Sequence, residues 1–313
     1  MVGGYLIFLA VFGGSVSGRA MVENYRPIIG VVSMDLLEEV PGYKTKIPAS
    51  YVKFVKAGGG RAAPVLCNQS EEYYDMIFRS TNGLLLPGGD VSLDDSCYAA
   101  VGRALLERAI QSEDYYPIWG TCLGFELLLH LTDPDRPNLT PCHSQYESLP
   151  VTFLEEPLSK STFGRELPSD IKEVLSSKNV TPNFHSFCMT MDNFTSHGLD
   201  NLWLPLSTSL DTNDLEFISI IEAKDRPFWG TQFHPEMSLF EWSPEFNSPE
   251  LHSPESIGQA QFFARFFVQE RRKNDHAFGS RKEEDDHVIY GFSPVYTGSE
   301  KVDDFYFQQY FFP

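Results

Sequence analysis

Short apolar runs alternate with segments of helical periodicity along most of the chain. The runs are rich in Val, Ile and Leu, as in strands that are buried on both faces of a sheet. The intervening segments carry apolar residues at the three- and four-residue spacing of an amphipathic helix. We therefore predict strands at residues 27–32, 61–66, 83–87, 117–120, 202–209, 216–222 and 227–233, and helices at residues 49–57, 71–79, 95–111, 123–131 and 256–272.

The strict alternation of strands and helices favours a parallel sheet, because parallel neighbours need a crossover that is usually helical. We expect an α/β fold of three layers, in which a doubly wound, mostly parallel sheet carries helices on both faces. Residues 25–313 show neither an internal repeat nor a linker, so we interpret them as a single domain. Residues 133–169 are interpreted as loops with short strands over the sheet edge, and the charge-rich residues 270–286 as a solvated, mobile loop.

The N-terminal residues differ from the rest of the chain. Residues 5–13 form an apolar run of the length found in a secretory signal peptide, and small residues follow it. Spanning a bilayer takes about 20 apolar residues, and no run in the chain reaches that length. We predict a signal peptide at residues 1–20 and no membrane span, with a buried N-terminal strand as the alternative for the run.

Sequons for N-linked glycosylation agree with a secretory route. There are more of them than the Asn, Ser and Thr content would place by chance. We therefore expect the protein in the secretory pathway, with the lysosome, the extracellular space or both as its destination. The acceptor residues are Asn68, Asn138, Asn179 and Asn193.

The composition narrows the function classes. With 42% hydrophobic and 21% charged residues, the chain is neither fibrous nor disordered. A formal net charge of −19 repels phosphate backbones, so we expect no nucleic-acid partner. The five cysteines are an odd number with no CxxC and no zinc spacing, so no metal site is predicted and at least one thiol is unpaired. The pairing of the other cysteines stays open.

The sharpest motif is Gly-Thr-Cys-Leu-Gly at residues 120–124, between a predicted strand and a predicted helix. A G-x-C-x-G turn is the thiol form of the nucleophile elbow, in which small residues allow a sharp turn that exposes the central side chain. The positive end of the following helix favours a thiolate at Cys122, and the backbone N–H of Leu123 can donate to an oxyanion. The alternative is a buried structural cysteine.

A nucleophilic thiol needs a base, which His-Pro-Glu at residues 234–236 supplies. His234 can exchange a proton with Cys122, and Glu236 can orient the imidazole. A further predicted strand runs into glycines, so that Gly88 or Gly89 is a candidate for the second oxyanion donor. Taken alone, the histidine could be structural and the glycine pair an ordinary turn.

These motifs, in this order, resemble the class I glutamine amidotransferase fold, and their details resemble the gamma-glutamyl hydrolases. The resemblance runs from about Arg26 to Gly298, is most specific at residues 120–126 and 292–298, and is weakest at residues 132–166. It implies cysteine-dependent hydrolysis of γ-glutamyl amide bonds, which trims the poly-γ-glutamate tail of folates and antifolates through a γ-glutamyl thioester. In that reaction Cys122 is the nucleophile, His234 the base and Glu236 its orienting residue, with no metal or organic cofactor.

The resemblance also implies a homodimer and substrate-site roles for Glu126, His185 and Tyr51. Glu126 lies four residues after Cys122, on the same helix face, where its carboxylate could bind a substrate ammonium group. His185 could pair with a substrate carboxylate. From the residues alone, Glu126 could equally be a surface acid, His185 structural and Tyr51 a half-buried aromatic. The alternative functions are a glutaminase, a hydrolase of other small γ-glutamyl amides, and a non-catalytic binding relative.

Overall fold

A computed structural model describes residues 23–133, 139–242, 250–298 and 306–313. The predicted signal peptide and the sequon at Asn138 lie outside these ranges. None of the helices in these ranges combines the length and the apolar character that crossing a membrane requires.

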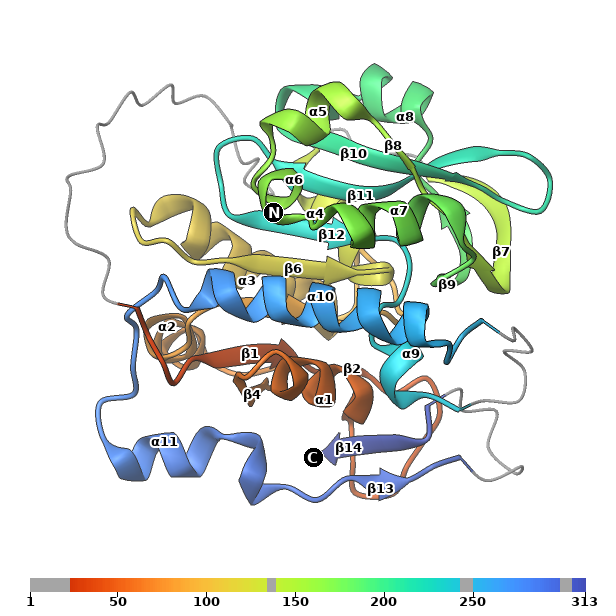
Figure 1. The fold of residues 1–313 in the computed structure, drawn as a ribbon. Helices are drawn as coiled ribbons and strands as arrows, with labels where there is room; N and C mark the ends of the chain where they lie inside the picture. Colours follow the sequence, from red (N-terminus) through yellow and green to blue (C-terminus); the bar gives the residue numbers. More distant parts are fainter. Residues whose placement is uncertain (1–22, 134–138, 243–249, 299–305) are drawn as a thin grey trace.

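The central sheet has eight strands in the described part of the chain, in the order β4-β1-β5-β6-β12-β11-β10-β8 (Figure 1). The first five strands of this order run parallel, and the last three are joined antiparallel. The prediction of a mostly parallel sheet is therefore confirmed, with an antiparallel extension at one edge. The strands are β1 (Ile28–Val32), β4 (Arg61–Val65), β5 (Leu84–Leu86), β6 (Ile118–Thr121), β8 (Thr152–Phe153), β10 (Trp203–Leu210), β11 (Glu216–Ala223) and β12 (Phe228–Thr231).

Two hydrophobic layers cover this sheet, as the alternation of side chains along a strand requires. Val31 and Trp119 pack into one core with helices α1 (Ala49–Ala57) and α10 (Pro254–Arg271). Ile118 and Leu84 pack into the other core with helices on the opposite face, which confirms the three-layer prediction (Figure 1). The helices of this second face are α2 (Glu71–Ser80), α3 (Cys97–Gln111) and α4 (Leu123–Thr132).

The interpretation of residues 133–169 as loops with short strands over the sheet edge is correct for β8, a short edge strand, and wrong for most of the stretch. This stretch contains β7 (Thr140–Leu149), which pairs with β9 (Thr181–Cys188) as a separate two-stranded sheet. The inward positions of β7 hold Cys142, Ser144 and Ser148, so the strand has no hydrophobic alternation to reveal it. Short helices α5 (Glu155–Lys160), α6 (Thr162–Glu166) and α7 (Ser169–Ser177) complete the segment.

The interpretation of residues 270–286 as a solvated, mobile loop is wrong at both ends of this range, which are helical, whereas residues 272–280 form no helix or strand. Helix α10 extends to Arg271, and residues Arg281–His287 form helix α11. Ser280 caps α11 by accepting a hydrogen bond from the N–H of Glu283, and the Glu284 carboxylate pairs with the Arg61 guanidinium near the start of β4. A tertiary ion pair thus orders charges that are typical of a solvated loop.

A second, four-stranded sheet was not predicted, because its strands are short and come from both ends of the chain. Its order is β13-β14-β3-β2 in the described residues, and it joins the C-terminal strand to the segment before α1. Helices α8 and α9 lie elsewhere in the chain, and α9 directly follows the His-Pro-Glu motif. The elements are β2 (Met34–Asp35), β3 (Thr45–Pro48), β13 (Val295–Tyr296), β14 (Gln308–Phe312), α8 (Met191–Ser196) and α9 (Met237–Phe240).

Candidate active site

Cys122 occupies the turn between β6 and α4, as the elbow motif predicts. Its φ of 51° and ψ of −109° are rarely adopted by a residue with a side chain, and such strain clusters at functional sites. Close packing explains the glycines: a Cβ on Gly124 would lie 2.1 Å from the carbonyl oxygen of Leu86, and one on Gly120 would lie 2.3 Å from that of Gly124. The turn therefore excludes larger residues at both positions and places the Cys122 thiol, 4% exposed, at the carboxyl end of a central strand.

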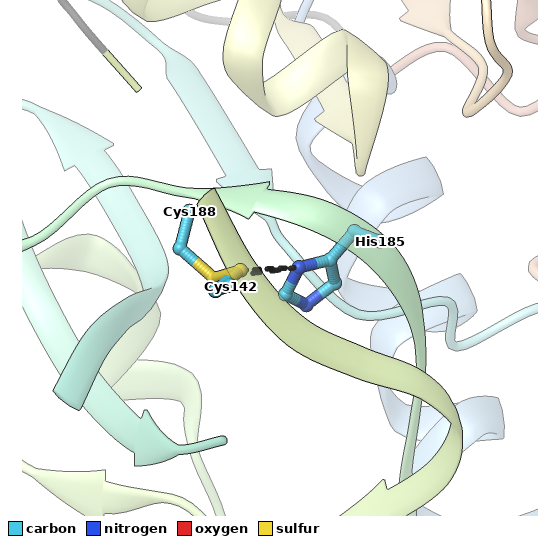
Figure 2. A group of neighbouring side chains, drawn as sticks. All are labelled: Cys142, His185 and Cys188. Atoms are coloured by element: carbon cyan, nitrogen blue, oxygen red, sulfur yellow. Dashed lines mark hydrogen bonds between the residues drawn. A yellow bond between two sulfur atoms is a disulfide. The ribbon is translucent and has the colours of Figure 1, made fainter. Parts of the chain in front are cut away.

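The other cysteines form two disulfides, which settles the pairing that the sequence left open. Cys67 pairs with Cys97, and Cys142 pairs with Cys188. Cys122 is the free thiol among the described residues. The His185 ring lies beside the Cys142–Cys188 disulfide (Figure 2), but sulfurs that are bonded to each other cannot serve as thiolate ligands of a metal.

His234 and Glu236 form the predicted pair just beyond the end of β12. The Nδ1 atom of His234 lies 2.8 Å from Oε1 of Glu236, and both residues are 1% exposed. The backbone N–H of His234 donates to the carbonyl of Pro182 on β9, which fixes the residue from the other side. In the described parts of the structure the buried Nε2 atom of His234 has no hydrogen-bond partner, so it is available to accept a proton.

Gly88 lies between the thiol and the imidazole. A Cβ at this position would be 2.7 Å from Cε1 of His234, 3.1 Å from Cβ of Cys122 and 2.6 Å from the hydroxyl of Tyr51. Cys122 and His234 therefore face the same small space, and only a glycine leaves room for a substrate carbonyl there. The geometry brings the predicted nucleophile and base together.

Tyr51 is fully buried behind the site and contacts its parts. Its hydroxyl accepts the backbone N–H of Gly88 at 2.8 Å and lies 3.2 Å from Nδ1 of His234. Because the Gly88 N–H is engaged in this bond, Gly89 is the better candidate for the second oxyanion donor. The Tyr51 hydroxyl also forms a hydrogen bond with Tyr306, a residue just before β14 that no sequence signal indicated.

The surroundings of Cys122 favour the protonated thiol, in contrast to the expectation from the helix end. Burial, followed by the nearby Glu126 and Glu236 carboxylates, raises the pKa of the Cys122 thiol well above its usual range, while the N–H of Leu123 acts in the opposite direction. The fold brings these two carboxylates to the thiol, and the helix end does not offset burial and their charges. An attack by this thiol requires that its proton leave, and His234 is the candidate base that would accept it.

Glu126 is buried beside the thiol and is not a surface acid. Gln232 donates its side-chain N–H to Oε1 of Glu126 at 3.0 Å, and burial raises the pKa of this carboxyl to about 8. At neutral pH the group is then mostly uncharged, so it suits a hydrogen bond to a substrate carboxylate or amide better than a charge pair with an ammonium group. Gln232 lies two residues before His234, and this proximity was the signal that could have indicated it.

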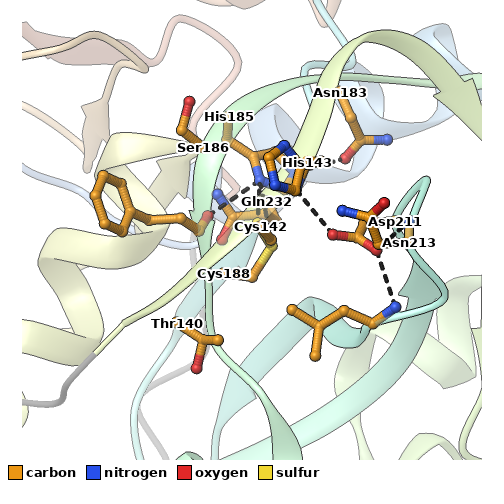
Figure 3. Close-up of a disulfide and its surroundings, with 12 residues drawn as sticks. Thr140, Cys142, His143, Asn183, His185, Ser186, Cys188, Asp211, Asn213 and Gln232 are labelled. Atoms are coloured by element: carbon orange, nitrogen blue, oxygen red, sulfur yellow. Dashed lines mark hydrogen bonds between the residues drawn. A yellow bond between two sulfur atoms is a disulfide. The ribbon is translucent and has the colours of Figure 1, made fainter.

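His185 lies on β9, with each ring nitrogen close to an oxygen atom (Figure 3). Nδ1 is 3.0 Å from the carbonyl oxygen of Phe187, and Nε2 is 3.1 Å from Oδ1 of Asn183. Burial, followed by the proximity of His234, lowers the pKa of His185 to about 3, so the ring is neutral and donates its single N–H to only one of these two oxygens. A neutral imidazole forms no charge pair with a substrate carboxylate, and the contacts of this ring indicate a role in shaping the β9 wall. That wall reaches the nucleophile, because the Phe184 carbonyl oxygen lies 3.8 Å from Sγ of Cys122.

The sequons differ in accessibility. Asn68 and Asn179 are exposed. Asn193 is half-buried, and its side-chain nitrogen, the atom that a glycan would occupy, donates a hydrogen bond to Thr140.

Comparison with known proteins shows the family of this chain. The model of the family described as Peptidase C26 matches residues 27–236. Gamma-glutamyl hydrolase of Rattus norvegicus is 35% identical, with 94% of this chain and 93% of the relative covered, and that of Homo sapiens is 37% identical, with 93% and 94% covered. Gamma-glutamyl hydrolase B of Dictyostelium discoideum is 32% identical, with 88% and 81% covered. The chain therefore belongs to the peptidase C26 family of gamma-glutamyl hydrolases.

Proposed function

We propose that this cysteine hydrolase cleaves γ-glutamyl amide bonds in the poly-γ-glutamate tails of folates and antifolates. One observation carries the proposal: the single free thiol of the described residues lies at a nucleophile elbow beside a buried His–Glu pair, in a chain that aligns with gamma-glutamyl hydrolases over almost its whole length.

Acylation begins when the Cys122 sulfur attacks the γ-carbonyl carbon of a glutamyl unit. The thiol proton moves to Nε2 of His234, and Glu236 stabilises the resulting imidazolium through Nδ1. The N–H groups of Leu123 and Gly89 donate to the oxyanion. The C–N bond then breaks as His234 returns the proton to the leaving amine, and a γ-glutamyl thioester remains on Cys122.

Deacylation repeats these steps with water as the nucleophile. His234 takes a proton from water, the hydroxyl oxygen bonds to the thioester carbon, and the C–S bond breaks. The sulfur recovers its proton from His234, and a free γ-carboxylate is released. The Glu126 carboxyl, neutral at pH values below its pKa of about 8, holds the glutamyl unit by a hydrogen bond.

Turnover of a pteroyl-poly-γ-glutamate by the purified mature protein tests this function. We expect free glutamate or short γ-glutamyl peptides, no ammonia from glutamine, and loss of turnover in Cys122→Ala with the fold retained by circular dichroism. Ammonia from glutamine with an intact folate tail would indicate a glutaminase instead. If the unmodified protein turns over neither substrate, either its substrate is a different γ-glutamyl amide or the protein has a binding role.

We further propose that the protein follows the secretory pathway to the lysosome or the extracellular space, and that it is a homodimer. The apolar run at residues 5–13, the exposed sequons at Asn68 and Asn179 and the two disulfides support the route. The dimer rests on family resemblance alone. Light scattering of the purified protein tests it, and a monomer mass at micromolar concentration would contradict it.

A further inference from the structure

A small aromatic pocket lies beside the residues that surround the triad, and the mechanism does not use it. It has a volume of about 240 Å³ and is lined by four aromatic residues, Phe240, Trp242, Tyr296 and Phe307, together with Lys53 and Gln308. This volume is below the roughly 300–1,000 Å³ of pockets for whole drug-sized ligands. It therefore suits one planar group of a larger molecule.

Two of these rings are fixed by contacts with neighbouring residues but remain largely exposed to solvent. Trp242 is 59% exposed although its ring stacks on His252 with the centroids 3.7 Å apart, and His252 in turn contacts the Ser238 carbonyl. Tyr296 is 61% exposed, with its hydroxyl bonded to the Gly298 carbonyl. Large aromatic rings fixed in this way with a free face are stacking platforms, and their exposure to water needs an explanation.

The pocket also carries a positive charge in a strongly acidic chain. The Nζ atom of Lys53 lies 5.9 Å from the centroid of the Phe240 ring. Lys53 also interacts electrostatically with the buried carboxyl of Glu241, whose pKa burial raises to about 7. The net charge of the whole chain is −19, so a cation beside aromatic rings is a local exception. A ligand with a flat ring and a nearby carboxylate complements both features.

Three elements connect the pocket wall to the active site. Helix α9, which supplies Phe240, begins directly after Glu236. Lys53 lies on α1, the helix that also carries Tyr51, although the two side chains project from different sides of it. Phe307 follows Tyr306, the hydroxyl partner of Tyr51, and its N–H donates to the buried carboxylate of Glu241 at 2.9 Å.

We propose that this pocket binds the aromatic head of the substrate, with the bicyclic ring stacked on Trp242 and Tyr296 and a carboxylate of the first glutamyl unit near Lys53. The proposal rests on the proposed function, because it assumes a substrate that carries a planar heterocycle at one end of a γ-glutamyl tail. It makes the pocket a specificity site that distinguishes folate conjugates from other γ-glutamyl peptides.

Kinetics with headed and headless substrates test the proposal. The headed substrate is pteroyl-tri-γ-glutamate, and the headless one is N-acetyl-tri-γ-glutamate. Trp242→Ala and Tyr296→Ala should each lower the headed-to-headless ratio of kcat/KM about tenfold, the size expected for one lost aromatic stack. Tyr290→Ala is the matched control, since Tyr290 is 62% exposed and does not line the pocket, and it should leave the ratio as it is.

The result that overturns the proposal is an unchanged ratio in Trp242→Ala and Tyr296→Ala, whatever happens to the separate rates. Trp242→Phe, which keeps a stacking ring, should recover most of the ratio and excludes misfolding as the cause. If the unmodified protein cleaves neither substrate, the proposed function fails and the ratio is not defined. The two failures are thus distinguishable.

Direct binding provides a second readout that does not need turnover. Pteroic acid, which has the ring and a carboxylate but no γ-glutamyl bond, is titrated into the Cys122→Ala protein. The other tryptophans, Trp119, Trp203 and Trp229, are at most 1% exposed, so stacking should quench mainly the Trp242 fluorescence. We expect saturable quenching that Trp242→Phe removes and Lys53→Gln weakens several-fold, and the absence of saturable quenching would refute the proposal.

Discussion

Removal of the Cys142–Cys188 disulfide should reduce both stability and activity, whereas removal of Cys67–Cys97 should reduce stability alone. The two disulfides have sequence separations of 46 and 30 residues. The loop-closure model then gives losses of about 4 and about 3.6 kcal/mol in the free energy of unfolding. Two double variants, one with Cys142→Ala and Cys188→Ala and the other with Cys67→Ala and Cys97→Ala, should therefore lose similar amounts of stability.

Their effects on activity should differ because of what each disulfide holds. Cys142–Cys188 joins β7 to β9, a separate two-stranded sheet, and such a ribbon has little stability of its own. Strand β9 carries the Phe184 carbonyl beside Sγ of Cys122 and the Pro182 carbonyl that accepts the N–H of His234. Cys67–Cys97 instead joins the chain after β4 to the start of α3.

Urea unfolding curves and kcat/KM check this reasoning, with kcat/KM measured under conditions where both variants are fully folded. We expect similar decreases in the unfolding free energy for the two double variants. The kcat/KM for a pteroyl-poly-γ-glutamate should fall at least tenfold only in the variant without Cys142–Cys188, since a small misplacement of catalytic groups has large effects on rate. Equal kcat/KM values in the two variants would refute the role assigned to the β7–β9 pair.

Three further predictions concern packing, pH and glycans. Gly124→Ala places a Cβ 2.1 Å from the Leu86 carbonyl oxygen and should cost at least about 1–3 kcal/mol in urea unfolding; an unchanged midpoint would contradict the close approach. The raised pKa of Glu126 means that its stability contribution is complete below the usual value of 4.5 and is lost as pH rises through about 8. Glu126→Gln should therefore flatten the decline in unfolding free energy between pH 4.5 and about 8. An equal slope in the variant and the unmodified protein would contradict the raised pKa of Glu126. Glycopeptide mapping of the protein produced in eukaryotic cells, from cell extract and medium together, should find glycans at the exposed Asn68 and Asn179, and unmodified peptides at both would argue against the secretory route.

The candidate catalytic residues were recognisable in the sequence because their signals are local. An elbow needs small residues on either side of its nucleophile, so Gly120, Cys122 and Gly124 can be read within one short segment. His234 and Glu236 lie two residues apart at a strand end. The alternation of strands and helices similarly predicts the parallel sheet, because each strand of its core is a continuous apolar run.

Features that depend on distant contacts were not predictable. Strand β7 faces inward with a cysteine and two serines, and helix α6 begins where the Glu222 carboxylate accepts the N–H groups of Thr162 and Phe163. Helix α11 is ordered through an ion pair with Arg61. In each case the stabilising partner is far away in sequence, so local periodicity does not indicate the element.

The sequence by itself determined the fold class and indicated the family and the candidate nucleophile and base. Only the tertiary structure decided the disulfide pairing, the engagement of Gly88 by Tyr51, and the protonation of the groups around the thiol. Pairing depends on which Cα atoms approach one another, and a pKa depends on burial and on charges brought from other elements. Both are properties of the packed chain, so they appear only when the β7–β9 pair, α4 and the C-terminal strand come together around Cys122.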